Sequence, residues 1–127
     1  NQLPATAKKD LFLKALLGLE EARQFRAAID GYHTALIHWP KNLIALIGIG
    51  NCYYAIGEFD NAEKALRKAI RYHPKSAPAF NNLAQIFFEQ GRKPEALAAA
   101  KKAVSLGGPM SSVYQKTLDE IKGLNEK

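Results

Sequence analysis

The sequence has almost no means of covalent cross-linking. Cys52 is its only cysteine, so no internal disulfide can form and the fold must come from packing alone. A chain of 127 residues is long enough to form one domain that buries about two-thirds of the surface of its unfolded chain. We therefore expect a single domain, and the cysteine content indicates nothing about its compartment.

Long apolar runs are also missing. Charged residues interrupt every stretch before it reaches the roughly 18 residues that a membrane-spanning helix needs. We expect no membrane span in this chain. Because the sequence begins at Asn1 without a Met, we interpret it as a domain cut from a longer protein.

Aromatic residues are not interleaved with the positively charged residues, as the binding of single-stranded nucleic acid would require. The net charge is +6, from 18 Lys and Arg against 12 Asp and Glu. Lys64, Lys68 and Arg71 recur at helical spacing, which is typical of a solvated outer face. A nucleic-acid interface is the competing interpretation, but we predict no nucleic-acid partner.

No arrangement of residues for catalysis or metal binding stands out. The three histidines, His33, His38 and His73, include no pair at the i, i+4 spacing that binds metals on a helix. Cys52 has no His or Asp near it in the sequence to activate it. The glycines of the segment 48–51 do not follow a strand, as a phosphate-binding loop requires. We therefore predict no enzyme activity, no metal site and no cofactor.

What the sequence does contain is an internal repeat. Small residues, prolines and glycines recur at a spacing of thirty-four residues: Ala28, Ala62 and Ala96; Ala35, Ala69 and Ala103; Pro40 and Pro74; Gly57 and Gly91. A fixed period of this length predicts units that bury their faces against neighbouring copies. We divide the chain into a lead-in at 1–8, repeats at 9–42, 43–76 and 77–110, and a terminal segment at 111–127.

Each unit is expected to form a helix, a turn and a second helix. Asn42 and Ser76 are suitable N-caps for the first helices of the second and third units. Gly57 and Gly91 supply the positive φ that ends those helices. Asp60 with Glu63 predicts a capping pair for the helix that follows.

The segment from Ser112 to Leu124 is amphipathic and is expected to cover the open end of the array. Its alternative role is that of a helix that docks on a partner. We favour the cap, because an uncovered terminal unit would expose its apolar face.

These features resemble the tetratricopeptide repeat family. The second unit matches its pattern best, through Leu46, Ile49, Gly50, Tyr53, Ala62, Leu66, Ala69 and Pro74. The first unit departs most, with Leu16 at a position for a small residue and Arg23 at the position of the turn glycine. The resemblance implies an all-α, right-handed α-solenoid of three helix-turn-helix units plus a C-terminal capping helix. It also implies a protein- or peptide-binding scaffold without a cofactor.

A second stripe on the first helices of the units is apolar or rich in amides, although a solvent face should be polar. In this family the stripe lines the concave groove, so we predict an extended peptide or a loop as the ligand. The predicted groove residues are Leu13, Leu17, Ile44, Ile47, Asn51, Tyr54, Asn81, Asn82, Gln85 and Phe88. The alternative is that these residues only pack against neighbouring helices.

Chaperone-binding members of the family hold a C-terminal carboxylate with Lys, Asn and Arg side chains on this face. The matching positions here are Leu13, Leu17, Gly48, Pro78 and Asn82. Because only one amide remains, we predict that a carboxylate clamp is absent.

The chain also resembles the C-terminal repeats of bacterial cysteine-peptidase-like lipoproteins of the bacteriocin-processing type. The similarity involves Trp39-Pro40 and the segments 47–51, 81–85 and 106–109. It implies an alternative function, in which the repeats dock on an upstream peptidase-like domain or present substrate to it. It also implies the bacterial cell envelope; without it, a cytoplasmic location is expected.

Overall fold

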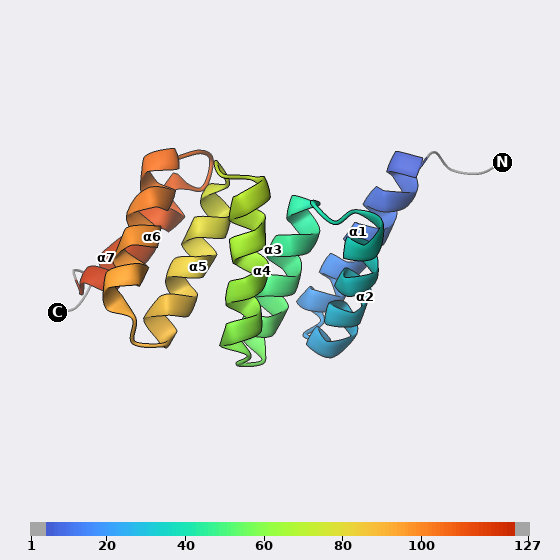
Figure 1. Ribbon diagram of the computed structural model, residues 1–127, viewed down its shortest axis with the longest axis horizontal. Coiled ribbons are helices and arrows are strands. Elements are labelled where there is room, and N and C mark those ends of the chain that lie inside the picture. Colours follow the sequence, from blue (N-terminus) through green and yellow to red (C-terminus); the bar gives the residue numbers. More distant parts are fainter. Residues whose placement is uncertain (1–4, 124–127) are drawn as a thin grey trace.

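The computed structural model describes residues 5–123, and within these residues there are seven α-helices and no strand. In chain order they are α1 (Ala5–Glu21), α2 (Phe25–His38), α3 (Leu43–Ala55), α4 (Phe59–Tyr72), α5 (Ala77–Glu89), α6 (Lys93–Leu106) and α7 (Ser111–Lys122) (Figure 1). The predicted all-α solenoid is therefore confirmed.

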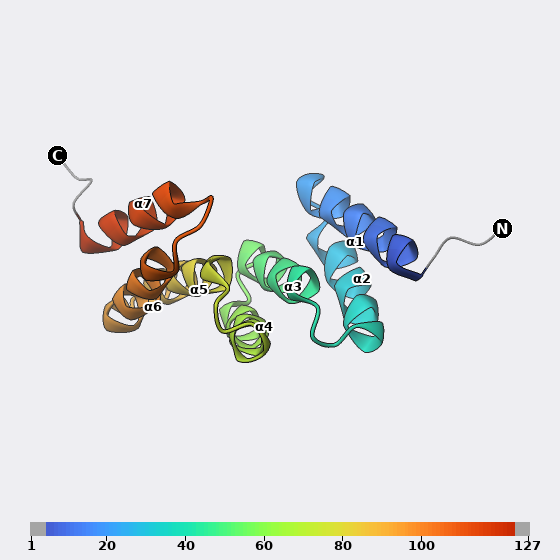
Figure 2. The ribbon, with the colours of Figure 1, turned by 90° about the horizontal axis from the view of Figure 1, so that it is seen from above.

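The helices form two layers. Seen from above, α1, α3, α5 and α7 lie in one layer, and α2, α4 and α6 lie in the other (Figure 2). In the same view α1 and α7 rise on either side of α3 and α5, so the first layer curves inward. We call it the inner layer and the layer of α2, α4 and α6 the outer layer. The chain termini lie at opposite ends of the array (Figure 1).

Side-chain caps begin the second and third inner helices. Asn42 Oδ1 accepts a hydrogen bond of 2.9 Å from the N–H of Ala45, at the start of α3. Ser76 Oγ accepts one of 3.3 Å from the N–H of Ala79, at the start of α5. Both predicted N-caps are confirmed, and each satisfies a backbone donor that the helix leaves free.

The inner helices end in the left-handed backbone region. Gly57 and Gly91 have φ values of +81° and +74°, as predicted. Arg23 occupies the matching position of the first unit and adopts φ 60° there. The turn geometry is therefore kept where the glycine is missing, at the steric cost that a Cβ atom brings to this region.

The predicted capping pair at the start of α4 is wrong. Glu58 precedes the helix, and its side chain makes no capping hydrogen bond. Glu63 is instead bonded to Arg67 at 2.7 Å and to Arg92 at 2.9 Å. Because Arg92 comes from the turn after α5, the local pattern around Asp60 could not reveal this partner.

Small residues set the distance between paired helices. Ala28, Ala62 and Ala96 are completely buried at matching positions of α2, α4 and α6. A Cβ atom added to Gly50 would lie 3.0 Å from Cγ of Leu66, which shows how closely α3 and α4 approach. Larger residues at these positions would overpack the core.

The first unit compensates for its large residue. Leu16 stands where the second unit has Gly50, and it packs against Gly31, which stands where the second unit has Ala65. A Cβ atom on Gly31 would overlap Cδ2 of Leu16. The volume added on α1 is thus removed from α2, so the helices still pack closely.

The first and last helices begin slightly before the residues at which the sequence predicted helix. The first helix begins at Ala5 rather than Lys9, so part of the predicted lead-in is helical. The last helix begins at Ser111, one residue before the predicted start, and ends at Lys122. The predicted end at Leu124 lies outside the described residues.

The helix α7 covers the end of the third unit. Leu118 and Ile121 are buried in a cluster with Phe87 and Ala100 of that unit. Tyr114 is buried against Ala77 in a smaller cluster. The predicted amphipathic face is therefore used for packing.

Candidate peptide-binding groove

Most of the predicted groove residues lie on α3 and α5, in the middle of the inner layer. Residues three and four positions apart on a helix share one face, which aligns Ile44, Ile47, Asn51 and Tyr54 on α3. The matching stripe on α5 consists of Asn81, Asn82, Gln85 and Phe88. We call these eight residues the trough.

The trough exposes apolar side chains. Ile44 is 51% exposed and Phe88 is 45% exposed, whereas Ile47 and Tyr54 are half-buried. Single exposed apolar residues are ordinary on a protein surface, but this group shares the inner face of two adjacent helices. Such a surface offers apolar area to a ligand.

Side-chain hydrogen bonds join the two helices across the trough. Asn82 Nδ2 donates to Asn51 Oδ1 at 2.7 Å. The hydroxyl of Tyr54 donates to Oε1 of Glu89 at 3.4 Å. Burial raises the pKa of Tyr54, and the nearby charge of Glu89 raises it further, so the hydroxyl stays protonated at neutral pH. These bonds hold the trough side chains in place before any ligand arrives.

Asn81 is placed differently from its neighbours. Its side chain is 4% exposed, and its Oδ1 is a buried side-chain acceptor without a hydrogen-bond partner in the part of the chain that the structure describes. An unpaired buried polar group costs about 1–3 kcal/mol. A side chain buried to this extent offers a ligand no contact surface.

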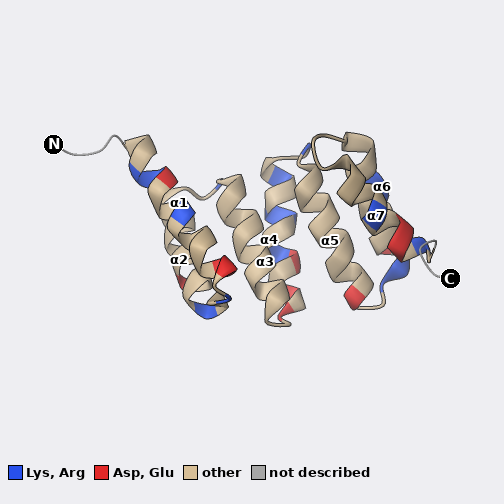
Figure 3. Cartoon of the chain, turned by 180° about the vertical axis from the view of Figure 1, so that it is seen from behind, with Lys and Arg blue, Asp and Glu red and all other residues tan. Residues whose placement is uncertain are grey.

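The floor of the trough is almost uncharged. No charged residue occurs in α3, and Glu89 is the only one in α5. The view from behind shows both helices almost entirely in tan, the colour of uncharged residues, whereas α1 and α7 carry charges of both signs (Figure 3). A ligand on this floor would meet apolar groups and amides rather than ions.

The trough deepens beside α7. A hollow of about 370 Å³ lies between Tyr54, Phe88 and residues of α7, namely Thr117, Glu120 and Ile121. The sequence predicted a cap at this place, with a helix that docks on a partner as the alternative, and neither prediction included this hollow. Its helical periodicity places Thr117 and Glu120 within one turn of the buried Ile121, which was the available signal.

The two predicted groove residues on α1 differ in exposure. Leu13 is 4% exposed and packs in the core cluster with Leu16 and Ile29, so it supports the helix and offers no contact surface. Leu17 is 44% exposed. Only Leu17 of this pair is available to a ligand.

The thiol of Cys52 is not activated. It is completely buried, and burial followed by the charge of Glu20 raises its pKa to about 12. A thiol with such a pKa is protonated at neutral pH and is a poor nucleophile. Among residues 5–123, no three His, Cys, Asp or Glu side chains gather as a metal site would require. No helix in that range has both the length and the apolar character to cross a bilayer.

Comparison with known families agrees with the repeat pattern. The tetratricopeptide repeat family matches residues 19–75 and, in a second match, residues 53–110. The chain belongs to the tetratricopeptide repeat family.

One curated protein is similar to this chain in sequence. The small glutamine-rich tetratricopeptide repeat-containing protein 2 of Mycosarcoma maydis is 29% identical over 101 residues, which is 80% of this chain. The matched region spans only 28% of that relative's length.

Among solved structures, the Sgt2 TPR domain from Aspergillus fumigatus is 24% identical, with a TM-score of 0.85, and the match covers 94% of this chain and 80% of that one. The type III secretion chaperone SycD of Yersinia enterocolitica, in complex with a peptide of the translocator YopD, is 16% identical. Its TM-score is 0.84, with coverage of 99% of this chain and 100% of that one. At these identities the likeness concerns the fold.

Proposed function

We propose that this chain is a binding scaffold whose trough holds an extended peptide or a loop of a partner protein. The observation that carries the proposal is the combination of exposed apolar side chains with amides on an uncharged floor. Ile44 and Phe88 are exposed on α3 and α5, beside the hydrogen-bonded pair of Asn51 and Asn82.

This surface has the chemistry that an extended peptide needs. Such a peptide has side chains that require apolar contact and backbone groups that require hydrogen bonds. The amide side chains of Asn82 and Gln85, which are not buried, provide both donors and acceptors. The solved relative SycD, which holds a peptide of YopD, supports a peptide ligand for this fold.

The proposed ligand is uncharged where it crosses α3 and α5. Lysine and arginine side chains do not stand at the positions of a carboxylate clamp, since Leu17, Gly48, Pro78 and Asn82 occupy four of them. A peptide with a buried terminal carboxylate would leave that charge unpaired, which is costly. We therefore propose an internal segment rather than a free C-terminus.

Selection of ligands from a displayed library of random ten-residue peptides tests the proposal. The selected peptides are titrated against the chain and against Tyr54→Ala and Tyr72→Ala. The matched control Tyr72 is an exposed tyrosine on α4 of the outer layer. We expect Tyr54→Ala to weaken binding by about ten-fold, the loss of a hot-spot contact of about 1.4 kcal/mol, and Tyr72→Ala to leave it unchanged.

The alternative, in which the trough residues only pack, makes the opposite prediction. Tyr54→Ala would then lower the thermal midpoint without a selective loss of binding. Selected peptides that bind Tyr54→Ala and Asn82→Ala as tightly as the wild type would overturn the proposal.

A further inference from the structure

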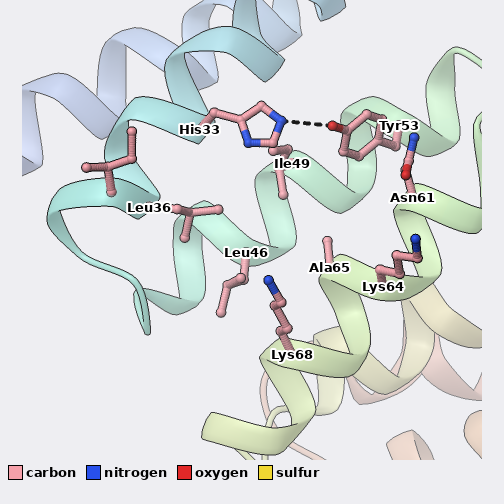
Figure 4. A pocket seen from close by; sticks show the side chains of 10 residues that line it. His33, Leu36, Leu46, Ile49, Tyr53, Asn61, Lys64, Ala65 and Lys68 are labelled. Atoms are coloured by element: carbon pink, nitrogen blue, oxygen red, sulfur yellow. Dashed lines mark hydrogen bonds between the residues drawn. The ribbon is translucent and has the colours of Figure 1, made fainter.

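A second hollow lies on the opposite side of the molecule, in the outer layer. It is a cleft of about 340 Å³ between α2 and α4, with α3 beneath it (Figure 4). Leu46 and Ile49 of α3 and Leu36 of α2 form an apolar floor. We call this hollow the outer cleft. None of its residues belongs to the trough.

An exposed isoleucine stands at the edge of the outer cleft. Ile37 is 77% exposed, the highest value of any large apolar side chain among residues 5–123. It lines the cleft together with Leu36 and Leu46. On the α2 side of the cleft, apolar surface therefore continues from the floor into solvent.

The α4 side of the outer cleft is cationic. Lys64 and Lys68 are four residues apart, so they stand one helical turn apart along the cleft. No carboxylate in the described chain lies within ion-pair distance of either ammonium group. Glu63, the acidic neighbour of Lys64 in the sequence, is already paired with Arg67 and Arg92.

One end of the outer cleft is closed by a polar contact. His33 Nε2 and the hydroxyl oxygen of Tyr53 are 2.9 Å apart and hydrogen bonded, and the two rings meet edge to face (Figure 4). Asn61 lines the cleft beside them. This end presents hydrogen-bonding groups, whereas the floor is apolar.

The repeat that follows shows that packing alone does not require this cleft. Thirty-four residues after Ile37 and Lys64, the chain has Arg71 and Ala98. The counterparts of His33 and Tyr53 are Arg67 and Phe87, and the guanidinium of Arg67 lies over the Phe87 ring at 5.6 Å. In the following repeat, a side chain of the protein itself therefore lies over the aromatic ring that corresponds to Tyr53.

We propose that the outer cleft binds an acidic peptide segment in which a large apolar side chain is flanked by Asp or Glu. The apolar side chain would lie on Leu46 and Ile49 beside Ile37. The carboxylates would pair with Lys64 and Lys68, whose charges have no partner in the chain. Charge complementarity selects this occupant, because a neutral or basic segment would leave both ammonium groups unpaired.

The test uses a fluorescent nine-residue peptide of alternating Glu and Leu and measures its anisotropy against the whole chain. The double variant Lys64→Glu with Lys68→Glu is compared with Lys101→Glu with Lys102→Glu, which changes the net charge equally on exposed positions of α6. We expect the first pair to weaken binding by about ten-fold or more and the second by less than about two-fold. An equal loss in both would mean unspecific attraction and would overturn the proposal.

Two further arms test the apolar part. Ile37→Ser removes only an exposed side chain, so it leaves the fold intact, and it should weaken binding by about ten-fold if the side chain anchors the peptide. A probe with Ser in place of Leu should not bind. Undiminished binding in either arm would contradict the proposal. Binding of the fatty acid dodecanoate in the cleft without binding of the peptide would also contradict it.

Chemical-shift mapping distinguishes this site from the trough. Addition of the acidic probe should shift backbone amides of α2 and α4, and Tyr54→Ala should not change its affinity. Shifts confined to the inner face of α3 and α5 would overturn the outer site while leaving the function of the trough supported.

Discussion

Replacement of Gly48 by alanine tests the packing between the first and second units. Gly48 lies in the middle of α3 and is buried against Tyr32 of α2, whose side chain is completely buried. A Cβ atom on Gly48 would lie 2.5 Å from the hydroxyl oxygen of Tyr32 and 2.8 Å from Cε1, and nearer still to Cζ. Real Cβ atoms do not approach so closely, so the tyrosine ring would have to move.

The ring of Tyr32 has little freedom to move. Its hydroxyl donates a hydrogen bond to the carboxylate of Glu20, and the ring is packed in the core cluster with Leu16 and Ile29. Overpacking costs about 1–3 kcal/mol, and a contact this close justifies the upper part of that range, about 2–3 kcal/mol. The higher helix propensity of Ala than of Gly offsets about 1 kcal/mol of this cost. We expect Gly48→Ala to lower the free energy of unfolding by about 1–2 kcal/mol.

Urea unfolding followed by helical circular dichroism measures this change. At a slope of about 2 kcal/mol per molar, the midpoint should fall by about 0.5–1 M. Gly18→Ala is the matched control, since Gly18 lies in α1 and a Cβ atom there meets no atom within 4 Å. The control should raise the free energy of unfolding by about 0.5–1 kcal/mol. A Gly48→Ala chain at least as stable as the wild type would refute the reasoning.

Three further predictions concern the turns, the charges and the end of the array. Arg23→Gly should stabilise the chain by about 1 kcal/mol in the same urea assay, because Arg23 holds the left-handed conformation that Gly57 adopts without strain; an unchanged or lower midpoint contradicts this. Burial raises the pKa of Glu63, but its hydrogen bonds and charge pairing with Arg67 and Arg92 outweigh burial and lower it. The contribution of Glu63 to stability is therefore present above the unfolded pKa of 4.5 and is lost as the pH falls through the lower folded pKa. Glu63→Gln should therefore flatten the acid side of the plot of unfolding free energy against pH. A variant whose plot runs parallel to that of the wild type would contradict this. Truncation after Met110 removes α7 and should cause aggregation or loss of cooperative melting. A truncated chain that stays monomeric with the same thermal midpoint would show that the cap is dispensable.

The thirty-four-residue period was sufficient to predict the fold, because each unit repeats the residues that decide its local geometry. Asn42 caps α3 with its own side chain, and Gly57 ends the helix with its own backbone. Both depend on neighbours in the sequence only. The compensation between Leu16 and Gly31 lies fifteen residues apart and becomes visible only when α1 packs on α2.

The candidate site was harder to predict, since a stripe on a helix does not say what covers it. Leu13 fits the stripe but is buried, whereas Ile44 on the same stripe is exposed. Glu63 pairs with Arg67 and also with Arg92, twenty-nine residues later, so a local capping pattern was misleading. The outer cleft was missed because Ile37 and Lys64 belong to different helices. Docking on an upstream peptidase-like domain, a bacterial envelope location and the three repeat limits stay predictions.

The side-chain amide signals of the chain give the most direct test of the trough as a peptide site. A nitrogen-15 labelled sample is titrated with a peptide selected from the library. The side-chain amide groups of Asn51 and Asn82 are compared with that of Gln24, which lies in the turn between α1 and α2 and belongs to neither the trough nor the outer cleft. We predict saturable shifts of the two trough amides, since the hydrogen bond between them would be exchanged for bonds to the peptide, with no shift of Gln24. Library-selected peptides that all bind while the two trough amides stay unchanged would contradict the account.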